Sequence, residues 1–270
     1  MSEGLQKRVV TAVVLVAILL AVVLWLPPVA TVVALTALVL AGAWEWSAFL
    51  RAPGALARAF YVAIVGVLLW VVWQVTQSAG GLNLVMAIAV VWWFIALAWI
   101  IFAPTRVQPW SAALAGLLAL VPAWLALVRL RLDLEQGAQW TLFTLLLVWV
   151  ADIGAFFFGR RYGSVRLAPN VSPGKTWEGV LGGMAMSALV AILGCYWFDL
   201  PVITFLPLCL AVVAFSIVGD LTESLLKRFA GVKDSGSLFP GHGGVMDRID
   251  SVTGAAPVLF LGLMALGVAG

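Results

Sequence analysis

The sequence predicts an all-α membrane protein: a polytopic bundle of about nine transmembrane helices, with a cytoplasmic N-terminus and a periplasmic C-terminus. Of its 270 residues, 64% are hydrophobic and only 10% are charged, and the mean hydropathy is +1.13. Soluble domains are about 45–50% apolar and about 25% charged. The apolar residues form long runs, and the basic residues collect between alternate runs. These features exclude a soluble globular domain, a disordered chain and a disulfide-stapled secreted domain.

Taken in order, the apolar runs provide nine candidate spans, because a helix needs about 20 mostly apolar residues to cross a bilayer. Lys7 and Arg8 precede the first run, yet its length and the Pro27-Pro28 that follows indicate a retained span rather than a signal peptide. The eighth run is the shortest and the ninth is rich in glycine. The predicted spans are 9–26, 29–49, 59–76, 82–102, 111–128, 140–158, 179–198, 202–218 and 252–270.

The distribution of lysine and arginine sets the predicted orientation. With the N-terminus in the cytoplasm, 13 of the 15 basic residues fall on the cytoplasmic side, and only Arg129 and Arg131 fall outside. Such an excess is typical of cytoplasmic connections. The net charge of +3 therefore reports orientation and contact with lipid headgroups, and we expect no nucleic-acid partner.

Polarity divides the chain into two regions. Residues 1–140 hold five spans and only four acidic residues, and we interpret them as a scaffold. Residues 141–270 are interpreted as the catalytic region, with cytoplasmic loops predicted at 159–178 and 219–250. The four acidic residues of the scaffold are Glu3, Glu45, Asp133 and Glu135.

The second polar segment begins with ionisable residues at helical spacing. Asp220, Glu223, Ser224 and Lys227 would share one helix face. Asp220 directly continues an apolar run, and ionisable groups at membrane depth are typically functional. The alternative is a solvated helix end with internal ion pairs.

Further along, glycine flanks His242, and backbone N–H groups beside Gly243 and Gly244 can approach an anion closely. Asp247 and Asp250 are three residues apart and can project from one helical face. Grouped carboxylates suit Mg²⁺, which shares its oxygen ligands with substrate phosphates. Carboxylates together with cations are typical of phosphoryl or nucleotidyl transfer. The nearby cations are Lys227, Arg228, Lys233 and Arg248.

The first polar segment adds two candidate features. Asp152 is a lone aspartate within an apolar run, which indicates either a site residue or a structural hydrogen-bonding group. Ser172 is predicted to cap a helix that begins at Pro173, which would place Lys175 at an anion-binding helix N-terminus. A phosphate-binding P-loop is excluded because Pro169 stands where its first glycine belongs and no strand is predicted before it.

These residues resemble the signature of the bacterial phosphatidate cytidylyltransferases, also called CDP-diacylglycerol synthases. The resemblance covers roughly the C-terminal half, and the N-terminal half is similar only in its number of apolar spans. The matching stretches are Ala151-Asp152-x-Gly154, Gly159-Arg160, Ser172-Pro173-x-Lys175-Thr176-x-Glu178-Gly179, Ser224-x-x-Lys227-Arg228, Lys233-Asp234-x-Gly236, Phe239-Pro240-x-His242-Gly243-Gly244 and Asp247-Arg248-x-Asp250.

The resemblance implies a reaction in phospholipid biosynthesis, in which CTP and phosphatidate yield CDP-diacylglycerol and pyrophosphate. It implies dependence on Mg²⁺, with a second, monovalent cation such as K⁺ left open. It also implies a homodimer in the bacterial inner membrane with its active site on the cytoplasmic side. A phosphate nucleophile is already anionic near pH 7 and needs no strong base. His242 is therefore interpreted as a nucleotide-binding or loop-ordering residue.

The expected site residues form three groups. The catalytic residues are Asp220, Asp247, Lys175, Lys227, Arg228, Lys233 and Arg248. The substrate-binding residues are Ser224, His242, Gly243, Gly244, Asp152, Arg160 and Ser172. The metal ligands are Asp220 and Asp247, with Asp250 and Glu223 as further ligands or as residues that support them.

Other classes of function explain fewer of these features. A transporter with buried carboxylates would account for the spans and Asp152, but not for the Gly-rich, Lys/Asp-rich segment near the end of the chain. A phosphotransferase that consumes CDP-lipids would carry a run of aspartates opening with Asp-Gly, which is absent here. A scaffold protein leaves the polar clusters unexplained. Incorporation of labelled CTP into lipid discriminates between these classes.

Overall fold

The computed structural model describes residues 3–51, 54–236, 238 and 243–269, with side chains from residue 13 onward. In these ranges the chain folds into nine α-helices, one 3-10 turn and one hairpin, which confirms the predicted all-α membrane bundle. Eight of these helices are long and apolar enough to span a membrane, and α1 has a shorter apolar stretch, Val13–Leu24. The elements are α1 (Glu3–Leu24), α2 (Pro28–Trp46), η1 (Ser47–Leu50), α3 (Gly54–Val75), α4 (Ala79–Phe102), α5 (Pro109–Asp133), α6 (Gly137–Tyr162), β1 (Arg166–Ala168), β2 (Ser172–Thr176), α7 (Trp177–Trp197), α8 (Val202–Ala230) and α9 (Met246–Ala265).

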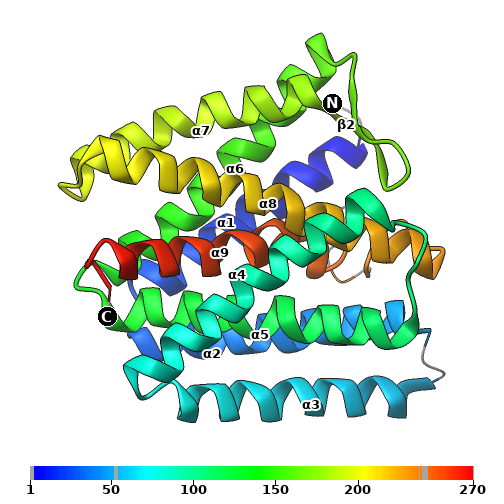
Figure 1. Cartoon of the computed structure of the whole chain (residues 1–270), viewed down its shortest axis with the longest axis horizontal. Helices are drawn as coiled ribbons and strands as arrows, with labels where there is room; N and C mark the ends of the chain where they lie inside the picture. Colours follow the sequence, from blue (N-terminus) through cyan, green and yellow to red (C-terminus); the bar gives the residue numbers. More distant parts are fainter. Residues whose placement is uncertain (1–2, 52–53, 237, 239–242, 270) are drawn as a thin grey trace.

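The helices run back and forth along the long axis of the molecule, with α3 at one edge and α7 at the other (Figure 1). The N- and C-termini lie at opposite ends of the bundle. The β1–β2 hairpin, the end of α8 and the start of α9 lie at the same end as the N-terminus, which we call the hairpin end. The alternating direction of successive helices agrees with the predicted order of the spans.

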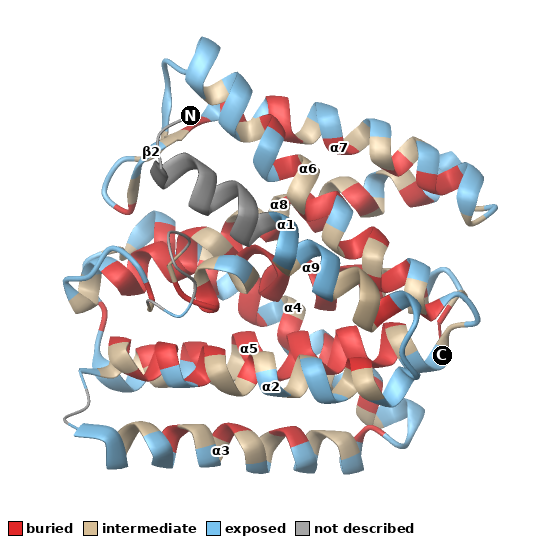
Figure 2. Ribbon diagram, turned by 180° about the vertical axis from the view of Figure 1, so that it is seen from behind, coloured by how far each residue is buried: buried red, intermediate tan, exposed pale blue. Residues whose placement is uncertain are grey.

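Helix α5 forms the centre of the bundle. Buried residues make up 72% of its most apolar window, compared with 17% for the peripheral helix α3. The contrast is visible in Figure 2, where buried residues concentrate between α5 and α9 and exposed residues line the outer helices. Large apolar side chains on those outer helices, such as Phe60 and Leu193, are exposed as a lipid-facing surface would require.

Glycines bring two helix pairs into close contact. At the α8–α9 crossing, a Cβ on Gly219 would lie 2.5 Å from the Asp250 carbonyl oxygen, and one on Gly254 would overlap the Phe215 carbonyl. At the α6–α7 crossing, a Cβ on Gly183 would lie 2.6 Å from the Ala151 carbonyl oxygen. Small residues permit such close approach in membrane helices. The first crossing matters for function because it places Asp220 and Asp250 on adjacent helices.

The structure corrects the predicted extent of the eighth and ninth helices. The eighth, expected to be the shortest, is the longest described helix, with 29 residues ending at Ala230, and α9 begins at Met246 rather than at 252. Much of the second polar segment is therefore helical rather than loop. Hydropathy marks where a chain becomes polar, whereas the helix stops only at Gly231, whose φ of 73° provides the left-handed C-terminal cap.

The Ser172 prediction is wrong. Ser172 and Pro173 belong to strand β2, which pairs antiparallel with β1 in the register Ala168↔Ser172 and Arg166↔Thr176. The N-cap of α7 is Thr176 instead, whose hydroxyl accepts a hydrogen bond from Gly179 N at 3.2 Å. A short strand thus precedes this segment, contrary to the prediction, although residues 172–176 are themselves a strand and not a phosphate-binding loop.

Candidate functional site

Helix α8 carries the first charged residues of the site at the hairpin end. Residues 202–219 supply about 27 Å of helix, close to the thickness of a bilayer core, before Asp220 is reached. Beyond that point one face stays polar but buried: Glu223 is 1% exposed and Lys227 is 8% exposed. Ser224 Oγ lies 3.3 Å from Asp220 Oδ1 and donates a hydrogen bond to it. The predicted shared face of Asp220, Glu223 and Lys227 is thereby confirmed.

Lys227 contacts two carboxylates, one on α8 and one on α9. Its Nζ lies 2.5 Å from Glu223 Oε2 and 2.8 Å from Asp247 Oδ1. Glu223 precedes Lys227 by four residues, so this first ion pair lies within one turn of α8. Burying these charges is tolerable only when they are paired. Lys227 therefore holds Glu223 in place and orients Asp247 at the start of α9.

Backbone groups fix the Asp247 carboxylate from the other side. Oδ2 accepts hydrogen bonds from Gly244 N at 2.7 Å and Ser235 N at 3.1 Å. Gly243 lies against this carboxylate with a φ of 77°, and a Cβ there would stand 2.5 Å from Asp247 Oδ2. A left-handed conformation with no side chain favours glycine. Both glycines named in the sequence analysis therefore shape the loop around Asp247.

Glu45 is the residue that sequence reasoning missed. It was assigned to the scaffold, but its buried carboxylate on α2 reaches the loop before α9. Its Oε2 accepts hydrogen bonds from Met246 N at 2.8 Å and from Ser235 Oγ at 3.0 Å. The only signal in the sequence was a lone acidic residue within an apolar run. Because Ser235 also binds Asp247, Glu45 supports the carboxylate of Asp247 through one intermediate residue.

A cavity of about 430 Å³, which we call the polar cavity for the four ionisable side chains in its wall, opens between α6, β2, α7 and α8. Asp152 and Arg160 from α6, Lys175 from β2 and Asp220 from α8 all contribute to its wall. Lys175 Nζ lies 2.5 Å from Asp220 Oδ2. The hairpin presents Lys175, and Glu178 anchors its base by accepting hydrogen bonds from Val165 N and Ser164 Oγ. The cavity brings together four residues that the sequence predicted as site residues.

The remaining predicted residues occupy different positions. Arg228 and Lys233 are exposed near the end of α8, and Ser172 is the first residue of β2, outside the polar cavity. Asp250 lies on the first turns of α9, where Oδ1 accepts a hydrogen bond from Ser251 N at 2.7 Å. The expected role of His242 falls outside the described residues. Asp220 and Asp247, expected to act together, are each paired with a different lysine.

Fold and site together define a polytopic membrane protein with paired lysines and carboxylates at one end of the bundle, one pair of which, Lys175 and Asp220, lines the polar cavity. Comparison with known families identifies the family of this protein. Residues 6–266 match the model of the Cytidylyltransferase family, and the chain belongs to that family. This confirms the family resemblance found in the sequence, and the chain is a transferase.

The curated relatives are bacterial proteins of similar length. The phosphatidate cytidylyltransferase of Haemophilus influenzae is 40% identical over 278 residues, covering 94% of this chain and 96% of that protein. The phosphatidate cytidylyltransferase of Pseudomonas aeruginosa is 42% identical over 276 residues, covering 97% and 98%. That of Synechocystis is 45% identical over 130 residues, covering 47% and 44%.

Proposed function

We propose that this chain transfers the cytidylyl group of CTP to phosphatidate, forming CDP-diacylglycerol and releasing pyrophosphate. The observation that carries the proposal is the polar cavity, whose wall holds Lys175 and Arg160 at the hairpin end of a bundle that belongs to the Cytidylyltransferase family. The relatives named phosphatidate cytidylyltransferase support the choice of substrates.

The reaction requires charge neutralisation more than proton transfer. An oxygen of the phosphatidate phosphate forms a bond to the α-phosphorus of CTP, and the bond from that phosphorus to the bridging oxygen breaks. Pyrophosphate leaves with the electron pair. Because the attacking phosphate is already anionic near pH 7, no strong general base is needed. Cations that meet the charge developing on the leaving group would lower the barrier.

The lysines are placed to provide that charge in different ways. Lys175 lines the cavity and its only described ion pair is with Asp220, so an entering phosphate can exchange with that carboxylate. Lys227 is held between Glu223 and Asp247 on the buried side of α8. Its charge offsets those carboxylates and keeps α8 and α9 in register. Lys175 is therefore assigned to substrate binding, and Lys227 to orienting Asp247.

The side chains of this site fit Mg²⁺, which we propose as the cofactor. Asp152, Asp220, Glu223, Asp247 and Asp250 offer the hard oxygen donors that this ion prefers. Asp220 and Asp247 are the proposed ligands, supported by Asp250 and Glu223. In the described residues no three acidic, histidine or cysteine side chains form a ready-made metal cluster. Mg²⁺ commonly completes its shell with water and substrate phosphates. When bound, it would polarise the phosphates and stabilise the leaving pyrophosphate.

The location of the enzyme is part of the proposal. We place the chain in the bacterial inner membrane with the hairpin end facing the cytoplasm, where CTP is available. The excess of basic residues between alternate spans supports this orientation. The family resemblance also implies a homodimer, which the mass of the purified protein in detergent would test.

The proposal is tested with purified protein in detergent, labelled CTP and phosphatidate. We expect label to enter lipid and pyrophosphate to be released only when both substrates and Mg²⁺ are present. Asp247→Asn should lower the rate on the order of 10²–10³-fold, because it removes a preorganised charge without changing size. Asp250→Asn should be milder or comparable.

The outcomes separate the parts of the proposal. Absence of any lipid product with the folded wild-type protein would reject the cytidylyltransferase function. Full activity in EDTA would reject the role of Mg²⁺ alone. Near-normal activity of Asp247→Asn at low Mg²⁺ would show that Asp247 is not a ligand.

A further inference from the structure

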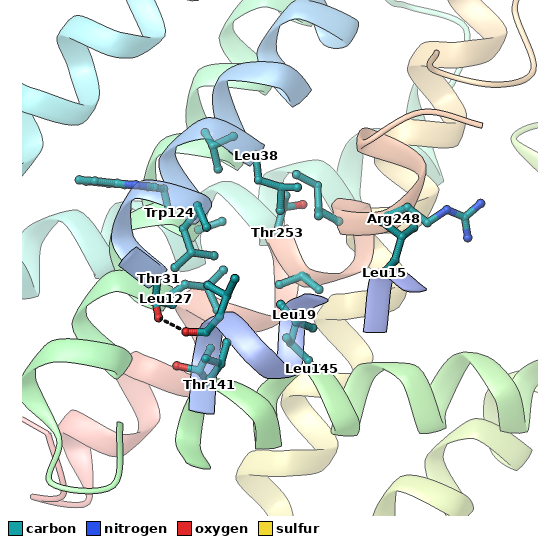
Figure 3. A pocket seen from close by; sticks show the side chains of 18 of the residues that line it. Leu15, Leu19, Thr31, Leu38, Trp124, Leu127, Thr141, Leu145, Arg248 and Thr253 are labelled. Atoms are coloured by element: carbon teal, nitrogen blue, oxygen red, sulfur yellow. Dashed lines mark hydrogen bonds between the residues drawn. The ribbon is translucent and has the colours of Figure 1, made fainter. Parts of the chain in front are cut away.

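A second cavity, of about 450 Å³, shares only helix α6 with the lining of the polar cavity. Figure 3 shows its wall of leucine, threonine and tryptophan side chains from α1, α2, α5, α6 and α9. On α1 the lining runs from Leu15 to Val23, a helix length of about 12 Å. The cavity is partly open at the surface, since the lining residues Val16 and Ile18 of α1 are exposed. In a membrane an apolar space of this kind is accessible to lipid hydrocarbon.

The lining favours hydrocarbon over water. The hydroxyl of Thr31 donates to Val22 O at 3.2 Å, and that of Thr141 donates to Gly137 O at 2.8 Å. The hydroxyl of Thr253 donates to Asp250 O at 2.5 Å. Each of these polar groups is therefore already engaged within the protein. Ordered water needs two or more polar partners, and an apolar cavity without them stays dry.

One end of this cavity is charged. Arg248 stands beside Leu15, and its guanidinium points away from the leucine and threonine side chains (Figure 3). Arg248 is adjacent in sequence to Asp247, so the first turn of α9 carries both residues. Asp247 contacts Lys227 of the site, while Arg248, Ile249 and Val252 line the apolar cavity. The same turn of α9 thus connects the apolar cavity to the proposed site of cytidylyl transfer.

We propose that this apolar cavity holds one acyl chain of the phosphatidate substrate, with the lipid phosphate at the Arg248 end. The proposal rests on the proposed function, which requires an anionic lipid headgroup beside Asp247. A guanidinium is the best protein partner for a phosphate because it donates several hydrogen bonds in a fixed fork. An acyl chain complements the long apolar wall. Phosphatidate combines such a chain with a phosphate, and it therefore matches both the wall and the Arg248 end.

Helix α1 is the wall through which the chain enters. The main contacts of α1 with other elements are with α2 and α6 only. Of its cavity-lining residues, Val16 is 38% exposed and Ile18 is 55% exposed. A chain that moves from the bilayer into this space exchanges one apolar environment for another. The cavity therefore positions the substrate, while the phosphate at the Arg248 end supplies selectivity.

The first test is direct and does not depend on activity. Phosphatidate carrying a photoreactive diazirine in the middle of one chain is irradiated with the purified protein, and adducts are mapped by mass spectrometry. We expect adducts on cavity residues such as Leu19, Leu38 and Leu145. Unlabelled phosphatidate should suppress them, and phosphatidylcholine should not. Adducts confined to outward residues such as Val33 and Trp70, or equal suppression by both lipids, would overturn the proposal.

The second test fills the cavity. Ala34 lines it from α2, whereas Ala37 is exposed on the same helix outside the lining. Ala34→Phe should raise the KM for long-chain phosphatidate about tenfold, as expected when bulk is inserted into an occupied space. The KM for CTP should not change, and a phosphatidate with very short chains should be affected much less. Ala37→Phe, the matched control, should behave as the wild type.

Failure of this inference differs from failure of the proposed function. If the wild-type protein makes CDP-diacylglycerol but Ala34→Phe leaves the KM for long-chain phosphatidate unchanged, the cavity is not the acyl-chain site. If the wild-type protein makes no lipid product, the proposed function itself is rejected. If Ala34→Phe does not fold, the diazirine experiment on wild-type protein still decides the matter.

Discussion

At the residue scale, the site depends on charges that are buried and paired rather than solvated. Lys227 contacts two carboxylates from two helices, and Asp247 accepts two backbone hydrogen bonds in addition. Removing one member of such a network leaves the others uncompensated, which is far more costly than losing a surface ion pair. The sequence predicted which residues are charged here, and the structure shows how each is held.

The supporting role of Glu45 leads to a prediction at the same scale. Glu45→Gln keeps the size of the side chain but replaces a buried charge that accepts from Met246 N and Ser235 Oγ. We expect activity to fall roughly 10–100-fold, as for other residues that orient a catalytic carboxylate. The Mg²⁺ concentration for half-maximal activity should rise, while the Tm in detergent changes little.

A matched control is Glu135→Gln, which removes an exposed carboxylate at the opposite end of the bundle. This control should be fully active. An unchanged Mg²⁺ dependence in Glu45→Gln, together with a large loss of Tm, would assign Glu45 to stability alone.

At the scale of the elements, close helix crossings determine where the charges meet. Gly219 lets α8 approach the backbone of α9 directly beside Asp220 and Asp250. Gly219→Ala would place a Cβ 2.5 Å from the Asp250 carbonyl oxygen, so the two helices must separate. Overpacking of this kind costs about 1–3 kcal/mol. We expect a lower Tm and reduced activity, measured on the same detergent sample.

The control for this crossing is Gly66→Ala in α3, where the nearest atom to the new Cβ is a leucine methyl at 3.9 Å. That variant should be as stable as the wild type or slightly more so, because alanine favours helix. Equal behaviour of the two variants would show that the α8–α9 crossing tolerates a larger separation.

The sequence predicted the membrane spans, but it did not predict the full length of α8, the hairpin or the role of Glu45. Apolar runs located the spans because a bilayer demands length and hydropathy. They did not reveal that α8 continues to Ala230, since a helix whose polar face is buried by its neighbours looks like a loop in a hydropathy pattern. The hairpin was missed because its strands are only three and five residues long. Glu45 was missed because its partner Ser235 lies 190 residues away.

At the scale of the whole molecule, the odd number of described helices puts the two termini at opposite ends (Figure 1). We predict that the hairpin end faces the cytoplasm. Both native cysteines are buried, which gives a low background for thiol labelling. In intact spheroplasts a membrane-impermeant maleimide should modify Gln136→Cys in the α5–α6 connection. Val232→Cys, after α8, should react only once the membrane is permeabilised.

The opposite pattern would reverse the orientation, and reaction of both sites from one side would contradict the nine-span arrangement. The labelling also bears on function, because CTP can reach the polar cavity only from the side on which Val232→Cys reacts.

The contact between Glu45 and the loop before α9 has a consequence for how this sequence can change over time. Cβ atoms on Gly236 and Gly244 would each overlap the carboxylate of Glu45. A side chain at either glycine therefore requires the Glu45 carboxylate to move, and at position 244 the Ser235 hydroxyl must move as well, so these positions do not vary independently. A shorter residue at 45, in turn, deprives Met246 N of its acceptor. Adaptation of the N-terminal helices is thus tied to the composition of a loop nearly 200 positions later.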